Sequence, residues 1–214
     1  MIRIVVADDH RLIRDGLCAL IRYAPDMEVV GEAADGREAV ATVANTSPNV
    51  VLMDVAMPQL NGVEATRQLA RLSSRAKVIA VSMRNDRQVV RGILRAGAVG
   101  YLLKDSAFDE LARAVRIVDD GKIYLSPSIE RHVENGALPD RKKHLDGSPL
   151  SARERDVLQV VAEGNSTRLI AKQLHIGIKT VETHRRHVMN KLELFSVAEL
   201  TKYAVRSGVS SLEV

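Results

Sequence analysis

Short apolar runs alternate with amphipathic stretches over roughly the first 125 residues of the chain. Runs of four to seven residues rich in Val and Ile are typical of strands that are buried on both faces of a parallel sheet. The runs are Ile2–Ala7, Glu28–Ala33, Val50–Met53, Lys77–Val81 and Gly100–Leu103. Apolar residues between the runs recur at helical spacing. The pattern predicts an α/β domain, a doubly wound five-stranded parallel sheet with five helices.

The last 65 residues show helical patterns only. Ser151 is a good N-cap, Glu154 completes a capping box with it, and Gly164 is expected to end this first helix. Further helices are predicted at about residues 167–174, 178–192 and 197–207. The tight turn between the first two of these lies at His175–Gly177. These elements predict a small all-α domain with a helix-turn-helix arrangement.

A segment that contains several Pro and Gly residues separates the two patterns and favours a linker, with a short helix around Ile129–Val133. We therefore expect an N-terminal domain at residues 1–122, a linker at 123–149 and a C-terminal domain at 150–214. A chain of 214 residues is long enough for two such domains.

Charge is distributed unevenly, with a net charge of +1 over residues 1–125 and +3 over residues 150–214. A small basic domain is a mild indication of nucleic-acid binding. Aromatic residues make up 3% of the chain and Trp is absent, which argues against a stacking platform for single-stranded bases. The single cysteine, Cys18, excludes an internal disulfide and a CxxC metal site, and we expect a buried, inert thiol.

The first apolar run is too short for a secretory signal and leads into two aspartates. No apolar stretch approaches the roughly 20 residues that a membrane-spanning helix needs. We therefore expect a cytoplasmic protein without a membrane partner.

Polar residues follow the predicted strands at their carboxyl ends. Asp8 and Asp9 follow the first strand, Asp54 the third, Ser82 the fourth and Lys104 the fifth. Because these ends lie side by side in a parallel sheet, the residues are expected to share one crevice. Clustered carboxylates favour a hard cation such as Mg²⁺, which prefers oxygen ligands. The set suits transfer of a phosphoryl group onto Asp54, with Lys104 stabilising the phosphoryl oxygens.

The same residues, in the same order, resemble the receiver domain of a two-component response regulator, and the resemblance covers residues 1 to about 122. Its motifs are Asp8-Asp9, Asp54-Val55-Ala56-Met57-Pro58, Ser82 and Gly100-Tyr101-Leu102-Leu103-Lys104-Asp105.

The resemblance implies that Asp54 is phosphorylated by a sensor histidine kinase. It also implies that Asp9 and Asp54 ligate Mg²⁺, that Asp8 does so directly or through water, and that the backbone carbonyl of Ala56 completes the protein ligands.

Three further roles come with the resemblance. Lys104 pairs with the phosphate, Ser82 moves toward it on activation, and Tyr101 changes rotamer as the readout. The family more often has Thr at the Ser82 position, although Ser keeps the hydroxyl. Two simpler interpretations remain open, with Ser82 as a turn residue and Tyr101 as an aromatic residue of an edge strand.

Two faces are expected on the helix that begins at Ile178. Its apolar stripe is formed by Val181, His184, Val188 and Leu192. We interpret His184 as a packed core histidine. The opposite, net basic face consists of Lys179, Glu182, Thr183, Arg186 and Asn190. A helix with one anchored face and one polar face fits the major groove of DNA.

The run Lys179–His184 and its surroundings resemble the LuxR-type helix-turn-helix of the NarL/FixJ response regulators, over residues 150 to about 205. We predict that Glu182, Thr183 and Arg186 contact bases, with Arg186 suited to guanine. We place Lys179 and Arg185 at phosphates. Thr180 completes the predicted DNA-contacting set.

Two positions depart from the family pattern. Gly177 stands where Ser usually caps the recognition helix, which weakens the cap by only a few tenths of a kcal/mol. Leu169 stands where an acidic residue is frequent, and nothing in the sequence explains it. The resemblance further suggests that the last helix, Val197–Ser207, dimerises the domain on two inverted half-sites of double-stranded DNA.

The predicted mechanism is a shift of population in which phosphorylation of Asp54 either frees the recognition helix from the receiver or produces a homodimer. The protein would then be a transcriptional regulator, with no enzyme activity beyond phosphorylation and dephosphorylation of Asp54. One alternative is a phosphatase or hydrolase with an Asp nucleophile, but the second acid usual two residues later is replaced by Ala56. Another is a DNA-binding or scaffold protein that acts without phosphorylation.

Overall fold

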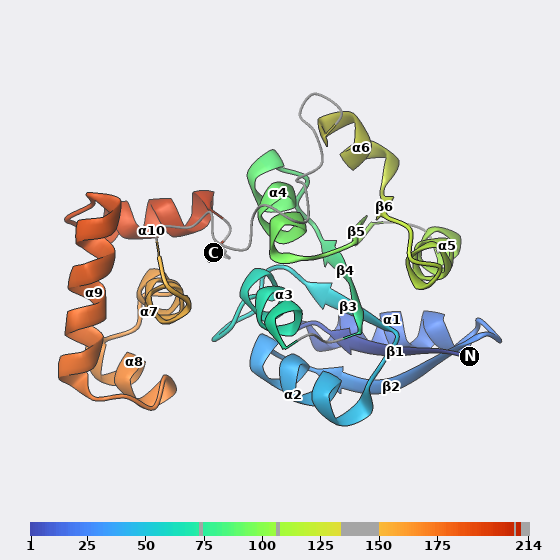
Figure 1. Ribbon diagram of the computed structural model, residues 1–214, viewed down its shortest axis with the longest axis horizontal. Helices are drawn as coiled ribbons and strands as arrows, with labels where there is room; N and C mark the ends of the chain where they lie inside the picture. Colours follow the sequence, from blue (N-terminus) through green and yellow to red (C-terminus); the bar gives the residue numbers. More distant parts are fainter. Residues whose placement is uncertain (73–74, 106–107, 134–149, 208, 211–214) are drawn as a thin grey trace. The chain divides into compact units, whose positions relative to one another are not determined.

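The computed structural model describes residues 1–72, 75–105, 108–133, 150–207 and 209–210 (Figure 1). The chain forms two compact units, Met1–Lys143 and His144–Val214. Each unit has its own hydrophobic core. No helix in the described ranges combines the length and apolar character needed to cross a membrane.

A parallel sheet in the order β2-β1-β3-β4-β5-β6 forms the centre of the first unit. Its strands are β1 (Ile2–Ala7), β2 (Met27–Ala33), β3 (Val50–Asp54), β4 (Lys77–Ser82), β5 (Gly100–Leu103) and β6 (Tyr124–Leu125). The predicted fold class and the first five strands are confirmed. The predicted count of five strands is one too few, because β6 adds a short strand at the edge next to β5.

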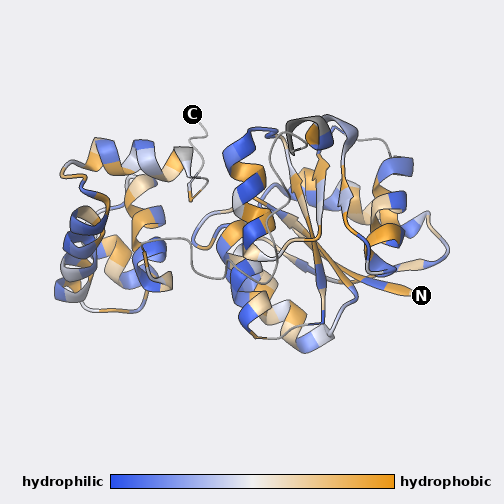
Figure 2. Ribbon diagram, turned by 45° about the horizontal axis from the view of Figure 1, so that its top comes forward, coloured by the Kyte–Doolittle hydropathy of each residue, from blue (hydrophilic) through white to orange (hydrophobic). Residues whose placement is uncertain are grey.

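Helices cover both faces of this sheet, and the apolar strands lie between them (Figure 2). One face carries α1 (Arg11–Arg22) and α5 (Phe108–Asp119), and the other carries α2 (Gly36–Thr46), α3 (Gly62–Arg71) and α4 (Arg87–Ala96). Neighbouring strand residues alternate between the two cores, because successive side chains of a strand point to opposite faces. Cys18 is buried on the α1 side, as predicted.

Part of the predicted linker is folded onto the first unit. The structure places residues 124–133 in β6 and in α6 (Pro127–Val133), which begins two residues before the predicted short helix. The remainder of the predicted linker, residues 134–149, lies outside the described residues.

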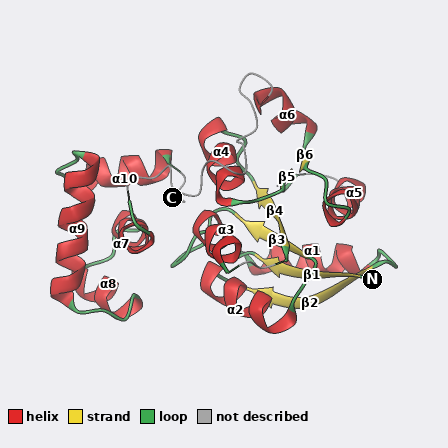
Figure 3. Cartoon of the chain, in the orientation of Figure 1, coloured by secondary structure: helices red, strands yellow, loops and turns green. Residues whose placement is uncertain are grey.

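The second unit is all-helical in its described part (Figure 3). Its helices are α7 (Ala152–Ala162), α8 (Thr167–Gln173), α9 (Ile178–Leu192) and α10 (Val197–Arg206). The predicted capping box of Ser151 and Glu154 is present, and Gly164 follows α7 with a φ of +80°. Gly177 precedes α9 without a side-chain cap, and the described bounds of α9 match the prediction.

Candidate functional site

The acidic pocket lies where β1 and β3 end. The two strands are paired so that Ala7 lies opposite Met53, and Asp8 and Asp54 therefore follow at the same sheet edge. The turn after β3 also requires glycine, since a Cβ on Gly62 would lie 1.9 Å from the carbonyl oxygen of Asp54. Gly62 thus allows the start of α3 to approach the end of β3.

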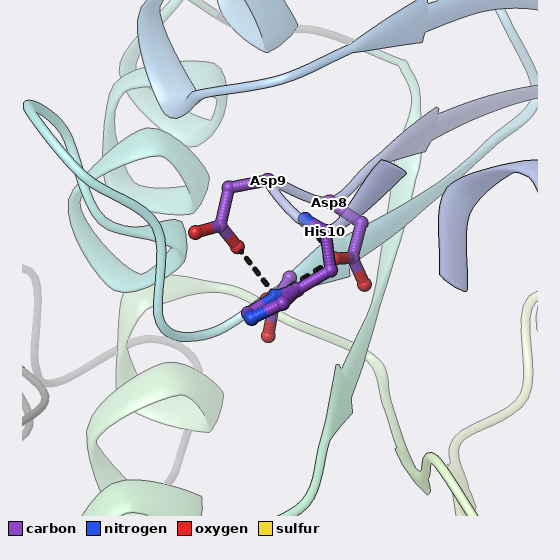
Figure 4. A group of neighbouring side chains, drawn as sticks. Asp8, Asp9 and His10 are labelled. Carbon is purple, nitrogen blue, oxygen red and sulfur yellow. Dashed lines mark hydrogen bonds and ion pairs between the residues drawn. The ribbon is translucent and has the colours of Figure 1, made fainter. Parts of the chain in front are cut away.

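Four side chains meet in this pocket, and those of the β1–α1 turn are shown in Figure 4. Asp8, Asp9, His10 and Asp54 each place one ligand-type atom within 4.8 Å of the others. Asp8 and Asp54 are almost fully buried, whereas the side chain of Asp9 is 24% exposed. His10 Nδ1 lies 3.0 Å from Asp9 Oδ1 and 3.5 Å from Asp8 Oδ1. The predicted carboxylates are therefore brought together.

Lys104 joins two of these carboxylates from the end of β5. Its Nζ lies 2.8 Å from Asp8 Oδ2 and 2.9 Å from Asp54 Oδ2, and the lysine side chain is only 6% exposed. The other Asp54 oxygen, Oδ1, accepts a hydrogen bond from the backbone N–H of Ala56 at 3.3 Å. The ammonium group thus offsets part of the repulsion between Asp8 and Asp54.

Burial dominates the protonation of Asp54. Loss of solvent raises the pKa of Asp54 to about 6, because it outweighs the attraction of Lys104, and the nearby Asp8 adds to the increase. For Lys104, burial lowers the pKa, but attraction by Asp54 and hydrogen bonds with Asp8 and Asp54 leave the pKa above its usual value. The pocket therefore keeps its lysine charged and makes its central carboxylate easier to protonate.

Ser82 and Tyr101 meet at the backbone of Arg84, in the loop after β4. The Arg84 N–H donates to Ser82 Oγ at 3.1 Å, and the Tyr101 hydroxyl donates to the Arg84 carbonyl oxygen at 2.5 Å. Both side chains are buried, Tyr101 completely, and burial raises the pKa of Tyr101 to about 12. One peptide segment thus connects a hydroxyl at the pocket edge with a core aromatic ring.

Sequence reasoning missed Arg14 as a residue of this region. Its Nη1 donates to the backbone carbonyl oxygen of Asp8 at 2.7 Å, and its Nε donates to Glu32 Oε2 at 3.3 Å. This guanidinium fixes the turn that carries the acidic pair to α1 and β2. Its position one helical turn after His10 was the available signal, because residues four apart share a helix face.

The second unit presents the predicted polar face on α9. Val181 and Val188 are buried in its core, while Glu182, Thr183 and Arg186 are exposed. Lys179 and Thr180 are exposed and Arg185 is half-buried. The Thr183 hydroxyl donates to the Lys179 carbonyl oxygen at 2.9 Å, within the helix. His184 is half-buried with a buried Nδ1, in line with the packed histidine that we expected.

A buried carboxylate connects α9 to the start of α7. Glu154 Oε2 accepts hydrogen bonds from Ser151 N–H and from Lys191 Nζ, each at 2.7 Å. His187 Nδ1 lies 3.9 Å from Glu154 Oε1. The sequence predicted that Glu154 takes part in the capping box. It did not predict the ion pair of Glu154 with Lys191, because Lys191 is 37 residues away in the chain.

Comparison with known families matches residues 4–116 to the response regulator receiver domain. Residues 148–204 match the bacterial regulatory proteins of the luxR family. The chain belongs to the NarL/FixJ family of response regulators. It is therefore a regulator of transcription with a receiver domain and a LuxR-type DNA-binding domain, as the two sequence resemblances predicted.

Relatives of the same construction support this membership in the response-regulator family. The transcriptional regulatory protein LiaR of Bacillus subtilis is 37% identical over 207 residues, covering 97% of this chain and 98% of LiaR. The oxygen regulatory protein NreC of Staphylococcus haemolyticus is 36% identical over 212 residues, covering 95% and 97%. Among solved structures, the response regulator RcsB in complex with DNA matches with a TM-score of 0.60 at 25% identity, covering 96% and 98%.

Proposed function

We propose that this response regulator accepts a phosphoryl group on Asp54 from a sensor histidine kinase, and that this modification controls dimerisation and sequence-specific DNA binding. The observation that carries the proposal is the position of Lys104 Nζ, which lies within 2.9 Å of carboxylate oxygens of both Asp8 and Asp54. In this position the Lys104 ammonium group can stabilise the negative phosphoryl oxygens that arrive at the nucleophile Asp54.

The donor set fits Mg²⁺. Three carboxylates offer oxygen ligands within one small cluster, which is the chemistry that this cation prefers. Asp9 Oδ1 is buried and accepts no hydrogen bond within the described part of the chain, with the His10 imidazole 3.0 Å away. We assign Asp9, Asp54 and the Ala56 carbonyl as direct ligands, and Asp8 as a direct or water-mediated one. When bound, the cation would screen the carboxylates from the incoming phosphoryl group.

The chain's own residues would carry the transfer. A carboxylate oxygen of Asp54 attacks phosphorus, the P–N bond of the kinase phosphohistidine breaks, and its electron pair remains on the imidazole nitrogen. Lys104 then gives up its ion pair with the Asp54 carboxylate and pairs with the new phosphoryl oxygens instead. Ser82 turns its hydroxyl toward the same oxygens, and the Arg84 backbone carries that movement to Tyr101.

The DNA-binding half of the proposal rests on α9. With Val181 and Val188 anchored in the core, the exposed Glu182, Thr183 and Arg186 would face base edges. The bond of the Thr183 hydroxyl to its own helix leaves the methyl group for apolar contact with thymine. The flanking residues Lys179 and Arg185 are assigned to phosphates, and Thr180 completes the DNA-contacting set. We assign α10 as the dimerising helix on inverted half-sites.

Intact-mass measurement after incubation with acetyl phosphate tests the phosphoacceptor. We expect one phosphoryl group per chain with Mg²⁺, none with EDTA, and none in Asp54→Asn. Asp15→Asn, an exposed carboxylate on α1, serves as the matched control and should be labelled normally. Labelling that persists in Asp54→Asn would contradict the proposal, and steady turnover of a small phosphoester would favour a phosphatase instead.

A further inference from the structure

Residues 124–133 are attached to the receiver through the backbone of Tyr101. Leu125 of β6 lies opposite Tyr101 of β5, and the Ser126 N–H donates to the Tyr101 carbonyl oxygen at 2.9 Å. Two residues earlier on each segment, the Tyr124 N–H donates to the Val99 carbonyl oxygen at 3.1 Å. These two backbone hydrogen bonds tie the β6 segment to β5, which carries the ring of Tyr101, and to the residue just before β5.

The following helix adds an apolar anchor to this attachment. Ile129 of α6 is completely buried in the same core cluster as the Tyr101 ring and the α4 residues Val89, Val90 and Ile93. The helices α4 and α6 lie in contact (Figure 1). The α4–β5 side of the receiver is thus an interaction surface, and its partner is the chain's own α6.

A polar cluster holds the other side of the segment on α5. Glu110 Oε1 accepts hydrogen bonds from the Tyr124 hydroxyl at 2.9 Å and from Ser126 Oγ at 2.7 Å. Arg113 donates to the Tyr124 hydroxyl at 3.1 Å and lies over the Tyr124 ring. Because these contacts involve only Tyr124 and Ser126, they hold β6 in place while leaving α6 dependent on Ile129.

The acidic pocket is connected to the same surface through Arg84. Its backbone N–H binds Ser82 Oγ, and its carbonyl oxygen accepts the Tyr101 hydroxyl. If Ser82 moves toward a phosphoryl group, the Arg84 peptide moves with it and the buried Tyr101 hydroxyl loses its acceptor. An unpaired buried hydroxyl is costly, so the ring must reposition, and it lies in the core that seats Ile129.

We propose that the α4–β5 surface holds α6 while Asp54 is unmodified and releases it when Asp54 is phosphorylated, with Tyr101 as the connecting residue and Ile129 as the anchor. This inference rests on the proposed phosphorylation of Asp54. The helix α6 would then carry the signal toward the second unit, because the chain continues from α6 into that unit. A seven-residue helix is also an element of low local stability, which suits α6 to release.

Hydrogen exchange of the full chain, followed by mass spectrometry, tests the release. Samples carry Mg²⁺ with or without acetyl phosphate, and intact mass reports labelling of Asp54 in each sample. We expect the α6 amides, residues 128–133, to exchange about tenfold faster or more in the phosphorylated protein, while β1 stays protected. Unchanged or slower exchange in labelled protein would overturn the inference alone, and failure to label Asp54 would overturn the proposed function with it.

Variants separate the anchor from the connection. In Ile129→Ala the α6 amides should exchange fast with or without the phosphodonor, because the buried side chain that anchors α6 in the core is lost. Ile123→Ala is the matched control, since Ile123 is 46% exposed, and it should respond as the wild type does. Tyr101→Phe keeps the ring but lacks the hydroxyl that donates to the Arg84 carbonyl oxygen. Phosphorylation should therefore change the exchange of the α6 amides much less in this variant than in the wild type. A full response in Tyr101→Phe, or wild-type protection in Ile129→Ala, would refute the mechanism.

Discussion

Replacement of Asp54 by Asn should stabilise the metal-free receiver at pH 8. The folded protein raises the pKa of this carboxyl from 3.8 to about 6, mainly by burial. The folded state therefore holds the proton more tightly than the unfolded chain. The resulting contribution to stability is complete below pH 3.8 and is lost as the pH rises through 6. At pH 8 the ionised carboxylate costs about 3 kcal/mol, which asparagine of similar shape avoids.

The remaining contacts of Lys104 support this estimate. Its Nζ lies 2.8 Å from Asp8 Oδ2, a contact that the substitution does not remove, so the variant should not leave a buried cation without a carboxylate partner. Thermal unfolding in EDTA should therefore show a midpoint roughly 6–12 °C higher for Asp54→Asn at pH 8, and this difference should vanish near pH 3. An equal or lower midpoint for the variant at pH 8 would refute the reasoning. Mg²⁺ should raise the midpoint of the wild type more than that of the variant.

Asp26, whose pKa is shifted in the opposite direction, provides a control for the direction of the pH dependence of stability. Hydrogen bonding by Arg116 lowers the pKa of the exposed Asp26 to about 2. Its contribution to stability is present above the unfolded pKa and disappears as the pH falls through the folded one. Asp26→Asn should therefore lower the midpoint slightly at pH 7 and have no effect near pH 2.

Three further substitutions test other parts of the account. Gly62→Ala places a Cβ 1.9 Å from the Asp54 carbonyl oxygen, so urea unfolding should show a loss of about 2 kcal/mol or more, and calorimetry should show weaker Mg²⁺ binding. Arg186→Ala should cost about 1–3 kcal/mol on the preferred DNA sequence and relax specificity, whereas Lys179→Ala should weaken binding to all sequences and reduce the salt slope by about 1, both measured by fluorescence anisotropy. Glu154→Gln keeps the capping acceptor but loses its ion pair, so urea unfolding of the second unit should show a loss of about 1–2 kcal/mol.

Local patterns in the sequence predicted the larger elements and the acidic pocket. Buried parallel strands are continuous apolar runs, and their carboxyl ends share one edge, so the sequence alone places Asp8, Asp54 and Lys104 together. The capping box at Ser151 and the two faces of α9 followed from spacing alone.

Short elements and long-range contacts could not be predicted in this way. The strand β6 is only two residues long, so it has no periodicity, and its pairing with β5 depends on the tertiary fold. Ser82 and Tyr101 are connected through the backbone N–H and carbonyl groups of Arg84, and backbone groups carry no sequence signal. The contact between Glu154 and Lys191 required the packing of α7 against α9.

The central claim is that phosphorylation of Asp54 controls DNA binding, and one titration tests it most directly. A duplex selected from a random pool is titrated with the full chain in Mg²⁺, with and without acetyl phosphate, for the wild type and Asp54→Asn. We expect the donor to raise wild-type affinity and to give two chains per duplex, while the variant does not respond. Equal wild-type affinity with and without the donor, in protein shown by mass to be labelled, would contradict the claim and favour DNA binding independent of phosphorylation.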